Sequence, residues 1–239
     1  MSHLFLVRHG QASFLERNYD KLSATGERQA RLLGEYWSHR RLVFQHVYSG
    51  PRMRQIETAR IVGDIYKDTG LSWPEVQIMQ EFDEYDSEWV MESSLAGLAA
   101  SNPQVRELQQ AFLNATTAGE KHKTFQRMFE VVIGKWVGGE IQVENVESWP
   151  EFCARVHRGL SLVCSVNGSR ENVAIFSSGG PIGVSLQRAL SLSPGNTLKV
   201  AWMARNCSFT EFLFSGERFT LSSFNALPHL DDPSLLTYR

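Results

Sequence analysis

Residues 4–10 read LFLVRHG, an apolar run that ends in a cation, an imidazole and a glycine. The apolar part predicts a buried strand, and in an open α/β sheet the carboxyl ends of the strands are where ligands bind. At such a position an imidazole can act as a nucleophile and a guanidinium can bind phosphate through two parallel hydrogen bonds. Glycine lets the backbone come close to an anion. The stretch therefore predicts a strand with an anion-binding group of residues at its end.

Strand-like and helix-like patterns alternate beyond this stretch, which favours an α/β fold built from layers. Apolar residues at three- and four-residue spacing predict a helix over residues 22–40. A short strand is predicted at 46–49, a helix at 52–66 and a third strand at 76–79. The continuous apolar run at 173–176 is typical of a central parallel strand that is buried on both faces.

The C-terminal part continues this pattern and then changes it. A glycine-rich turn follows residue 176 and leads into a helix that ends near Leu190. Two extended segments, 208–214 and 218–224, are separated by Ser-Gly-Glu. This spacing predicts a hairpin at the edge of the sheet.

Residues 85–148 interrupt the alternation. Apolar residues recur at three- and four-residue spacing over 125–136, which predicts an amphipathic helix with a wide apolar face. Pro103 and Gly119, each within a polar run, separate further helices. Because sheet elements resume afterwards, we interpret the segment as a helical insertion that caps the active-site edge of a single domain over residues 1–239.

The composition is that of an ordinary globular protein, with 42% hydrophobic and 21% charged residues and a net charge of -2. This charge predicts no broad basic surface, so we expect no nucleic-acid partner. No apolar stretch approaches the roughly 18 residues that span a bilayer, and Arg8 interrupts the N-terminal apolar run, so we expect no membrane partner and no signal peptide. Cys153, Cys164 and Cys207 lack the close pairing of a metal or redox motif. We therefore expect a cytoplasmic protein with reduced thiols.

Three more groups of polar residues follow predicted strands. The string SGPRMRQIETA (49–59) places Arg54 just inside a helix. The third strand is followed by Gln-Glu-Phe-Asp-Glu (80–84), and the fourth by Ser-Ser-Gly-Gly (177–180). The last of these enters a helix, whose first N–H groups can bind an anion. Because all of them follow parallel strands, we expect them to meet at one edge of the sheet.

These motifs, in this order, resemble those of the histidine phosphatase superfamily, in its phosphoglycerate mutase-like branch 1. LVRHG matches the signature of that family, and LSATGERQA matches its Leu-Thr-x-x-Gly-x-x-Gln-Ala. SGPRMRQIETA matches Ser-Ser-Pro-Leu-x-Arg-Ala-x-x-Thr-Ala. ESWPEFCARV (147–156) resembles the helix before the last core strand, and NALPHL (225–230) resembles the C-terminal Asn-x-x-x-His-Leu. Only the helical insertion matches no motif.

The resemblance implies a three-layer α/β fold and a phosphatase that hydrolyses a phosphate monoester without a metal or an organic cofactor. His9 would attack phosphorus in line and become phosphohistidine, which water would then hydrolyse. Arg8 and Arg54 would bind the phosphoryl oxygens and neutralise their charge in the transition state. Glu81, at the position of the family's acid, would protonate the leaving alkoxide, for which it must itself be protonated near neutral pH.

The remaining phosphate-binding residues implied are Gly10, Ser178 and Gly179. Ser178 departs from the family, which has Ser-His-Gly-Gly at this turn. A serine hydroxyl donates one neutral hydrogen bond, worth about 0.5–1.5 kcal/mol, against roughly 1.5–3 kcal/mol for a charged donor. The loss of about 1–2 kcal/mol lowers the rate on the order of 10- to 30-fold. We therefore expect a site that is weakened and still functional.

Neighbouring residues compete for two of these roles. Arg52 is the alternative to Arg54, although we interpret it as a residue of the helix surface. Asp83 and Glu84 are both alternatives to Glu81. His229 matches a family position, but we expect it to be structural.

The function also has alternatives. A mutase would move the phosphoryl group between hydroxyls, and a phosphate-ester-binding or regulatory protein would not turn its ligand over; Ser178 favours the latter. A nucleotide-binding module would need glycine motifs that the chain lacks. The expected partner is a small-molecule phosphate ester, with a phosphoprotein also open. We expect residues 85–148 to determine the choice of substrate.

Overall fold

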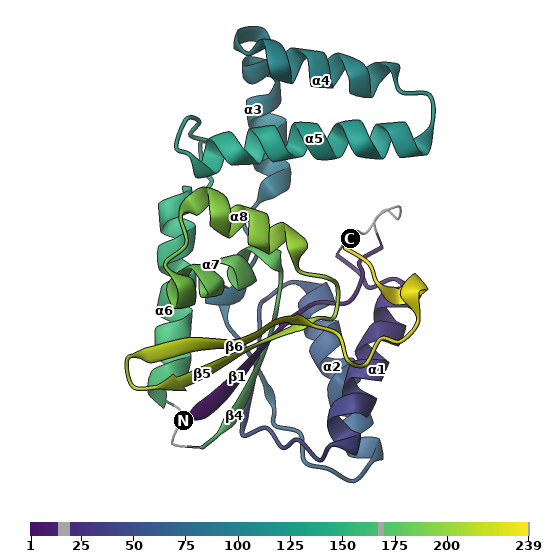
Figure 1. Cartoon of the computed structure of the whole chain (residues 1–239), viewed down its shortest axis with the longest axis vertical. Coiled ribbons are helices and arrows are strands. Elements are labelled where there is room, and N and C mark those ends of the chain that lie inside the picture. Colours follow the sequence, from purple (N-terminus) through teal and green to yellow (C-terminus); the bar gives the residue numbers. More distant parts are fainter. Residues whose placement is uncertain (14–19, 167–169, 239) are drawn as a thin grey trace. The chain divides into compact units, whose positions relative to one another are not determined.

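The computed structural model describes residues 1–13, 20–166 and 170–238 (Figure 1). The chain forms two compact units, one of residues Met1–Glu84 with Ala154–Arg239 and the other of Tyr85–Cys153. Within the described residues, no helix combines the length and the apolar composition that crossing a membrane requires.

The first unit is built on a six-stranded sheet in the order β3-β2-β4-β1-β5-β6. Strands β1 to β4 are parallel, while β5 is antiparallel to β1 and β6 to β5. This confirms the predicted α/β class, the mostly parallel sheet and the edge hairpin. The strands are β1 (Ser2–Arg8), β2 (His46–Ser49), β3 (Val76–Ile78), β4 (Asn172–Ser177), β5 (Phe209–Ser215) and β6 (Arg218–Ala226).

The strand register brings the predicted site residues to one edge. Arg8, the last residue of β1, lies opposite Ser177, the last residue of β4. Ser49 at the end of β2 lies opposite Phe176. The loops that follow β1, β2 and β4 therefore leave the sheet side by side.

Helices cover both faces of this sheet (Figure 1). Helices α1 (Ala24–His39) and α2 (Met53–Asp68) pack on one face, where Trp37 and Tyr66 are buried against sheet residues such as Phe176. Ser23 caps α1 by accepting a hydrogen bond from the Gly26 N–H, as its position before the helix predicts. The other helices of this unit are α7 (Gly179–Leu190), α8 (Pro194–Met203) and the part of α6 (Trp149–Val166) that begins at Ala154. Short 3-10 turns lie at Gln80–Phe82 and Pro233–Leu235.

Helix α8 is absent from the sequence prediction. It begins with Pro194-Gly195, a pair that indicates a loop, and spans only ten residues. The structure supplies the local reason for the helix: Pro194 occupies its first turn, and the Ser193 side chain accepts a hydrogen bond from the Asn196 N–H.

The second unit is helical, as predicted, with α3 (Ser87–Ser101), α4 (Pro103–Asn114) and α5 (Ala118–Val137). The predicted apolar stripe over residues 125–136 lies in α5, where Val132, Ile133 and Trp136 are buried. Both predicted breaks fall at helix starts, since Pro103 opens α4 and Gly119 lies in the first turn of α5. Two capping residues fix these starts: Asn102 for α4 and Thr117 for α5.

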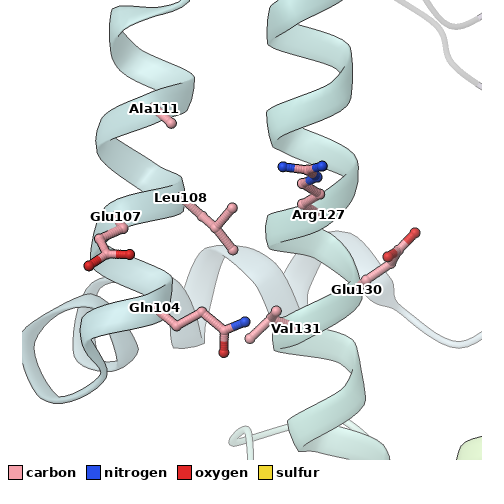
Figure 2. A pocket seen from close by; sticks show the side chains of 7 residues that line it. All are labelled: Gln104, Glu107, Leu108, Ala111, Arg127, Glu130 and Val131. Atoms are coloured by element: carbon pink, nitrogen blue, oxygen red, sulfur yellow. The ribbon is translucent and has the colours of Figure 1, made fainter.

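A groove runs between α4 and α5 in this unit (Figure 2). Leu108 and Val131 face each other across it, and charged side chains surround them. The lining residues are Gln104, Glu107, Leu108, Ala111, Arg127, Glu130 and Val131.

Candidate active site

His9 directly follows β1 and is buried, with 5% of its surface exposed. Its Nδ1 lies 2.7 Å from the carbonyl oxygen of Gly10, and its Nε2 lies 3.1 Å from Nε of Arg54. A carbonyl can only accept a hydrogen bond and a guanidinium N–H can only donate one. These two partners therefore place the hydrogen of the ring on Nδ1 and the lone pair on Nε2.

The surroundings of His9 also keep the ring neutral. Burial lowers the pKa of His9 well below its ordinary value, and the positive charges of Arg54 and Arg8 lower it further. The hydrogen bond to Gly10 opposes this shift more weakly. At neutral pH, Nε2 consequently has the unprotonated lone pair that a nucleophile needs.

The backbone around His9 is fixed from several directions. The His9 N–H donates to the carbonyl of Ser177 at 2.9 Å, which ties the ends of β1 and β4 together. The His9 carbonyl accepts from the Asn206 side chain at 3.2 Å. The Gly10 N–H donates to Oγ1 of Thr58 at 3.0 Å.

Gly10 is required here by packing. A Cβ atom at this position would lie 2.5 Å from the carbonyl oxygen of Gly26 at the start of α1. The glycines of LVRHG and LSATGERQA thus let the turn after β1 lie directly against α1. Both backbone polar groups of Gly10 form hydrogen bonds within the protein, the N–H to Thr58 and the carbonyl to His9.

Arg54 lies in the first turn of α2 and is buried, with 6% exposed. Besides the contact with His9, its NH1 donates to Oδ1 of Asp20 at 2.7 Å. Oδ2 of Asp20 accepts from the Met53 N–H at 2.9 Å, so one carboxylate holds both the guanidinium and the start of the helix. The sequence analysis missed Asp20. A carboxylate near Arg54 could be expected only indirectly, because a buried arginine needs such a partner. Asp20 lies 34 residues away from Arg54 in the sequence, so no local pattern identified it.

The two other arginines near the site have different surroundings. Arg8 donates through NH1 to the carbonyl of Ala204. Arg52 precedes α2 and pairs with Asp83, its Nε lying 2.6 Å from Oδ1. Of the two arginines in the 49–59 motif, Arg54 is therefore the one in contact with His9.

Ser178 and Gly179 form the turn between β4 and α7. Ser178 is 1% exposed and occupies the position just before the helix. Its Oγ accepts a hydrogen bond from Nε2 of Gln55 at 2.8 Å. Gln55, on α2, is a second residue that the sequence analysis missed.

The three candidate acids have different contacts. Glu81 packs against α6, since a Cβ atom at Gly159 would lie 2.5 Å from its Cβ. Asp83 accepts from Arg52 and from the Glu84 N–H. Glu84 reaches the start of α7, where its Oε2 accepts from the Gly180 N–H at 3.0 Å. Glu84 is thereby bonded to the helix start beside Ser178.

His229 is buried among aromatic residues. It packs on Phe209 and Tyr36, with ring centroids 6.4 and 6.2 Å away, and burial lowers its pKa to about 4. These contacts agree with the structural role expected for it. Across the described part of the chain, no three or more His, Cys, Asp or Glu side chains gather into a group that could hold a metal ion.

The arrangement has the parts that phosphoryl transfer needs. A neutral imidazole presents Nε2, and the positive charges of Arg8 and Arg54 act on the ring. The start of α7 lies at the end of the neighbouring strand β4. A carboxyl group, Glu84, is bound to that helix start. Such a set can bind an oxyanion and attack its central atom.

The family model of the histidine phosphatase superfamily (branch 1) matches residues 4–137 and 116–227. No curated protein matches the sequence. Among solved structures, the phosphoserine phosphatase of Entamoeba histolytica, determined with 3-phosphoglyceric acid, has 20% identity and a TM-score of 0.63, covering 96% of this chain and 100% of its own.

Two bacterial structures are similarly related. A phosphoglycerate mutase from Bacillus anthracis has 17% identity and a TM-score of 0.63, covering 95% of this chain and 94% of its own. YhfR from Bacillus stearothermophilus has 14% identity and a TM-score of 0.67, covering 97% and 100%. At these identities the likeness shows a shared fold.

Proposed function

The chain belongs to the histidine phosphatase superfamily (branch 1), and on that premise we propose that it hydrolyses a phosphate monoester through a phosphohistidine on His9. The observation that carries the proposal is the state of His9. Its two hydrogen-bond partners and its lowered pKa leave a neutral ring with the lone pair on Nε2, next to the cation of Arg54. This combination suits attack on an anionic phosphorus centre.

In the first step, the hydrogen bond that the Arg54 Nε–H donates is transferred from Nε2 to a phosphoryl oxygen, and Nε2 forms a bond to phosphorus while the bond to the ester oxygen breaks in line with it. The ring becomes positively charged, and the Gly10 carbonyl, which accepts from Nδ1, stabilises that charge. Arg54 and Arg8 neutralise the negative charge of the phosphoryl oxygens. In the second step, water attacks phosphorus, the bond to Nε2 breaks, and inorganic phosphate leaves.

The leaving oxygen needs a proton, and we propose Glu84 as its source in place of Glu81. The family resemblance implies Glu81, but that side chain packs against Gly159, whereas Glu84 bonds to Gly180 beside Ser178. The negative charges of a bound phosphate ester favour the protonated form of a carboxyl group beside them. In the second step the resulting carboxylate can take a proton from the attacking water.

We propose a small-molecule phosphate ester as substrate, with a phosphoprotein as the second class to test. Similar structures include a phosphoserine phosphatase and a phosphoglycerate mutase, both named for small phosphate esters. The helical insertion at 85–148 is proposed to select among such esters.

Two other functions would use the same residues. A mutase would transfer the phosphoryl group to a second hydroxyl, and a binding or regulatory protein would hold the ester without turnover. Ser178 favours the binding protein, because a neutral donor stands where the family has histidine.

Product analysis with an aryl phosphate tests these three functions. The protein is incubated with 4-nitrophenyl phosphate and a chelator, with and without glycerol as acceptor, and phosphate, glycerol phosphate and nitrophenol are measured. A phosphatase releases phosphate and nitrophenol in equal amounts under both conditions. Transfer that requires glycerol would support the mutase, and no release, together with stabilisation of the protein by the ester, would support the binding protein.

A further inference from the structure

Gln55 and Ser178 form a hydrogen-bonded pair that joins α2 to the start of α7. Both are buried, with 0% and 1% of their surfaces exposed. Nε2 of Gln55 lies 2.8 Å from Oγ of Ser178. The pair therefore connects the helix of Arg54, which contacts His9, to the turn between β4 and α7.

The direction of this hydrogen bond is fixed by the other end of the amide. Oε1 of Gln55 accepts from the Arg52 N–H at 3.1 Å, as the third helical residue does in a capping box. The nitrogen of the amide must then face Ser178, with the Phe82 carbonyl at 3.5 Å on the same side. Ser178 accordingly accepts, and its own hydrogen remains to be donated to another acceptor. A hydroxyl that accepts a hydrogen bond is also a stronger donor.

Gln55 and Ser178, which contact each other, both differ from the family motifs. In the family motif that SGPRMRQIETA matches, alanine follows the arginine, and in the family's Ser-His-Gly-Gly a histidine occupies the position of Ser178. This chain has a larger residue, Gln55, at the first position and a smaller one, Ser178, at the second. Two departures in direct contact, opposite in volume, are what a compensated exchange in a packed site requires.

We propose that Gln55 is a positioning residue that makes Ser178 a neutral, oriented hydrogen-bond donor to the phosphoryl group, and that the pair together replaces a charged donor. The inference rests on the proposed function and deepens it. It has two consequences: the two side chains act as one unit, and a histidine at position 178 fits only when Gln55 is made small.

A double-mutant cycle tests the first consequence. Vanadate affinity is measured by calorimetry, and kcat/KM with 4-nitrophenyl phosphate, for the wild type, Ser178→Ala, Gln55→Met and the double variant. We expect each single change to weaken vanadate binding about three- to tenfold, the range of one neutral hydrogen bond, and the double variant to be no weaker than the worse single one. Losses that multiply in the double variant would overturn the proposal.

Ser185→Ala is the matched control. Ser185 is a buried serine on the same helix, and its hydroxyl donates to the Pro181 carbonyl at 2.8 Å. It should leave vanadate affinity unchanged. Melting temperatures of all variants separate lost binding from lost folding.

An exchange of the pair tests the second consequence. Ser178→His alone should lower kcat/KM, because Gln55 Nε2 occupies the space beside Oγ. In Gln55→Ala/Ser178→His we expect recovery to at least the wild-type value, and a vanadate affinity that rises as the pH falls from about 8 to 6, where histidine gains its charge. Equal activity of the single and double variants, or no change of the pH dependence, would contradict the proposal.

The two proposals fail in different ways. If the wild type releases no phosphate from any ester, the proposed function falls, while the vanadate cycle still decides the coupling of Gln55 and Ser178. If the wild type turns over and the cycle is additive, the positioning role falls alone. A wild type that binds neither vanadate nor phosphate contradicts both.

Discussion

The two sides of the candidate site differ in charge. At the end of β1 lie His9 and Arg8, with Arg54 against the ring and Asp20 behind it. At the end of β4 lie Ser178 and the glycines of the turn, with one carboxyl group, Glu84, at the helix start. The first side is cationic and matches its family motif, whereas the second is neutral or acidic and departs from it.

Under the proposed function, this difference divides the steps of phosphoryl transfer between the two sides. Neutralising the charge on a phosphoryl group calls for cations, and each charge-assisted contact is about twice as strong as a neutral one. In the proposed mechanism the β1 side therefore supplies the nucleophile and most of the electrostatic stabilisation. In the same proposal the β4 side orients the phosphoryl group and, through Glu84, supplies a proton. Changes on the β1 side should consequently cost more.

The largest effect is expected for His9→Ala. Without Nε2 the covalent intermediate cannot form, so kcat should fall by at least roughly 1,000-fold, as for other nucleophiles. Steady-state kinetics measures the loss, and an unchanged melting temperature shows that the fold is kept. Retention of more than a few per cent of kcat would break the assignment of the β1 side as the nucleophilic one.

Arg54→Ala should follow, with kcat/KM lowered roughly 100- to 1,000-fold because a preorganised charged donor is lost. Asp20→Asn keeps the side-chain shape and should cost less, since the guanidinium remains present and loses only its carboxylate partner. The two variants are compared by kcat/KM and by vanadate inhibition. An Asp20→Asn loss as large as that of Arg54→Ala would mean that Asp20 acts directly in the site.

The comparison of Glu84→Gln with Glu81→Gln locates the acid on the β4 side. We expect Glu84→Gln to lower kcat about 100-fold with an alkyl phosphate, whose leaving oxygen needs a proton, and much less with an aryl phosphate. Glu81→Gln, the matched control, should have little effect on either ester. A larger loss for Glu81→Gln would return the role to the family position.

The pH dependence tests the neutral state of His9. Because burial, Arg54 and Arg8 lower its pKa well below the ordinary value of about 6.5, the nucleophile should lose activity only when the pH falls well below 6.5. Arg54→Ala removes one cause of the shift and should move this acid limb upward, toward 6.5. The limb is read from log kcat/KM against pH, and an unmoved limb would contradict the electrostatic coupling.

The smallest effect is on the free energy of unfolding. Measuring it distinguishes a loss of activity at low pH from unfolding of the protein. The folded-state pKa of His229 is about 4, below the unfolded value of about 6.5. The contribution of the neutral ring to the free energy of unfolding is therefore fully present above pH 6.5 and is lost as the pH falls toward 4. The loss amounts to about 3 kcal/mol at most. His229→Phe retains the packing on Phe209 and should flatten this decline in urea unfolding between pH 7 and 4.5. An identical decline would assign it to other groups.

The sequence allowed the strand ends and the cationic side to be predicted because those signals are local. The apolar run before Arg8 and the short motif around Arg54 each lie within one strand or one helix start. Asp20 and Gln55 escaped prediction because their roles come from contacts across long stretches of sequence. The sequence left the acid open among Glu81, Asp83 and Glu84, and the contact of Glu84 with Gly180, on which our proposal for the acid depends, joins residues 96 positions apart.

Trapping of the covalent intermediate tests the assignment of His9 most directly. The protein is mixed with a phosphate ester labelled at phosphorus, quenched in base, digested and analysed by mass spectrometry. We predict a base-stable, acid-labile phosphoryl group on His9 in the wild type and none in His9→Ala. Turnover without any such label, or a label on another residue, would contradict the mechanism.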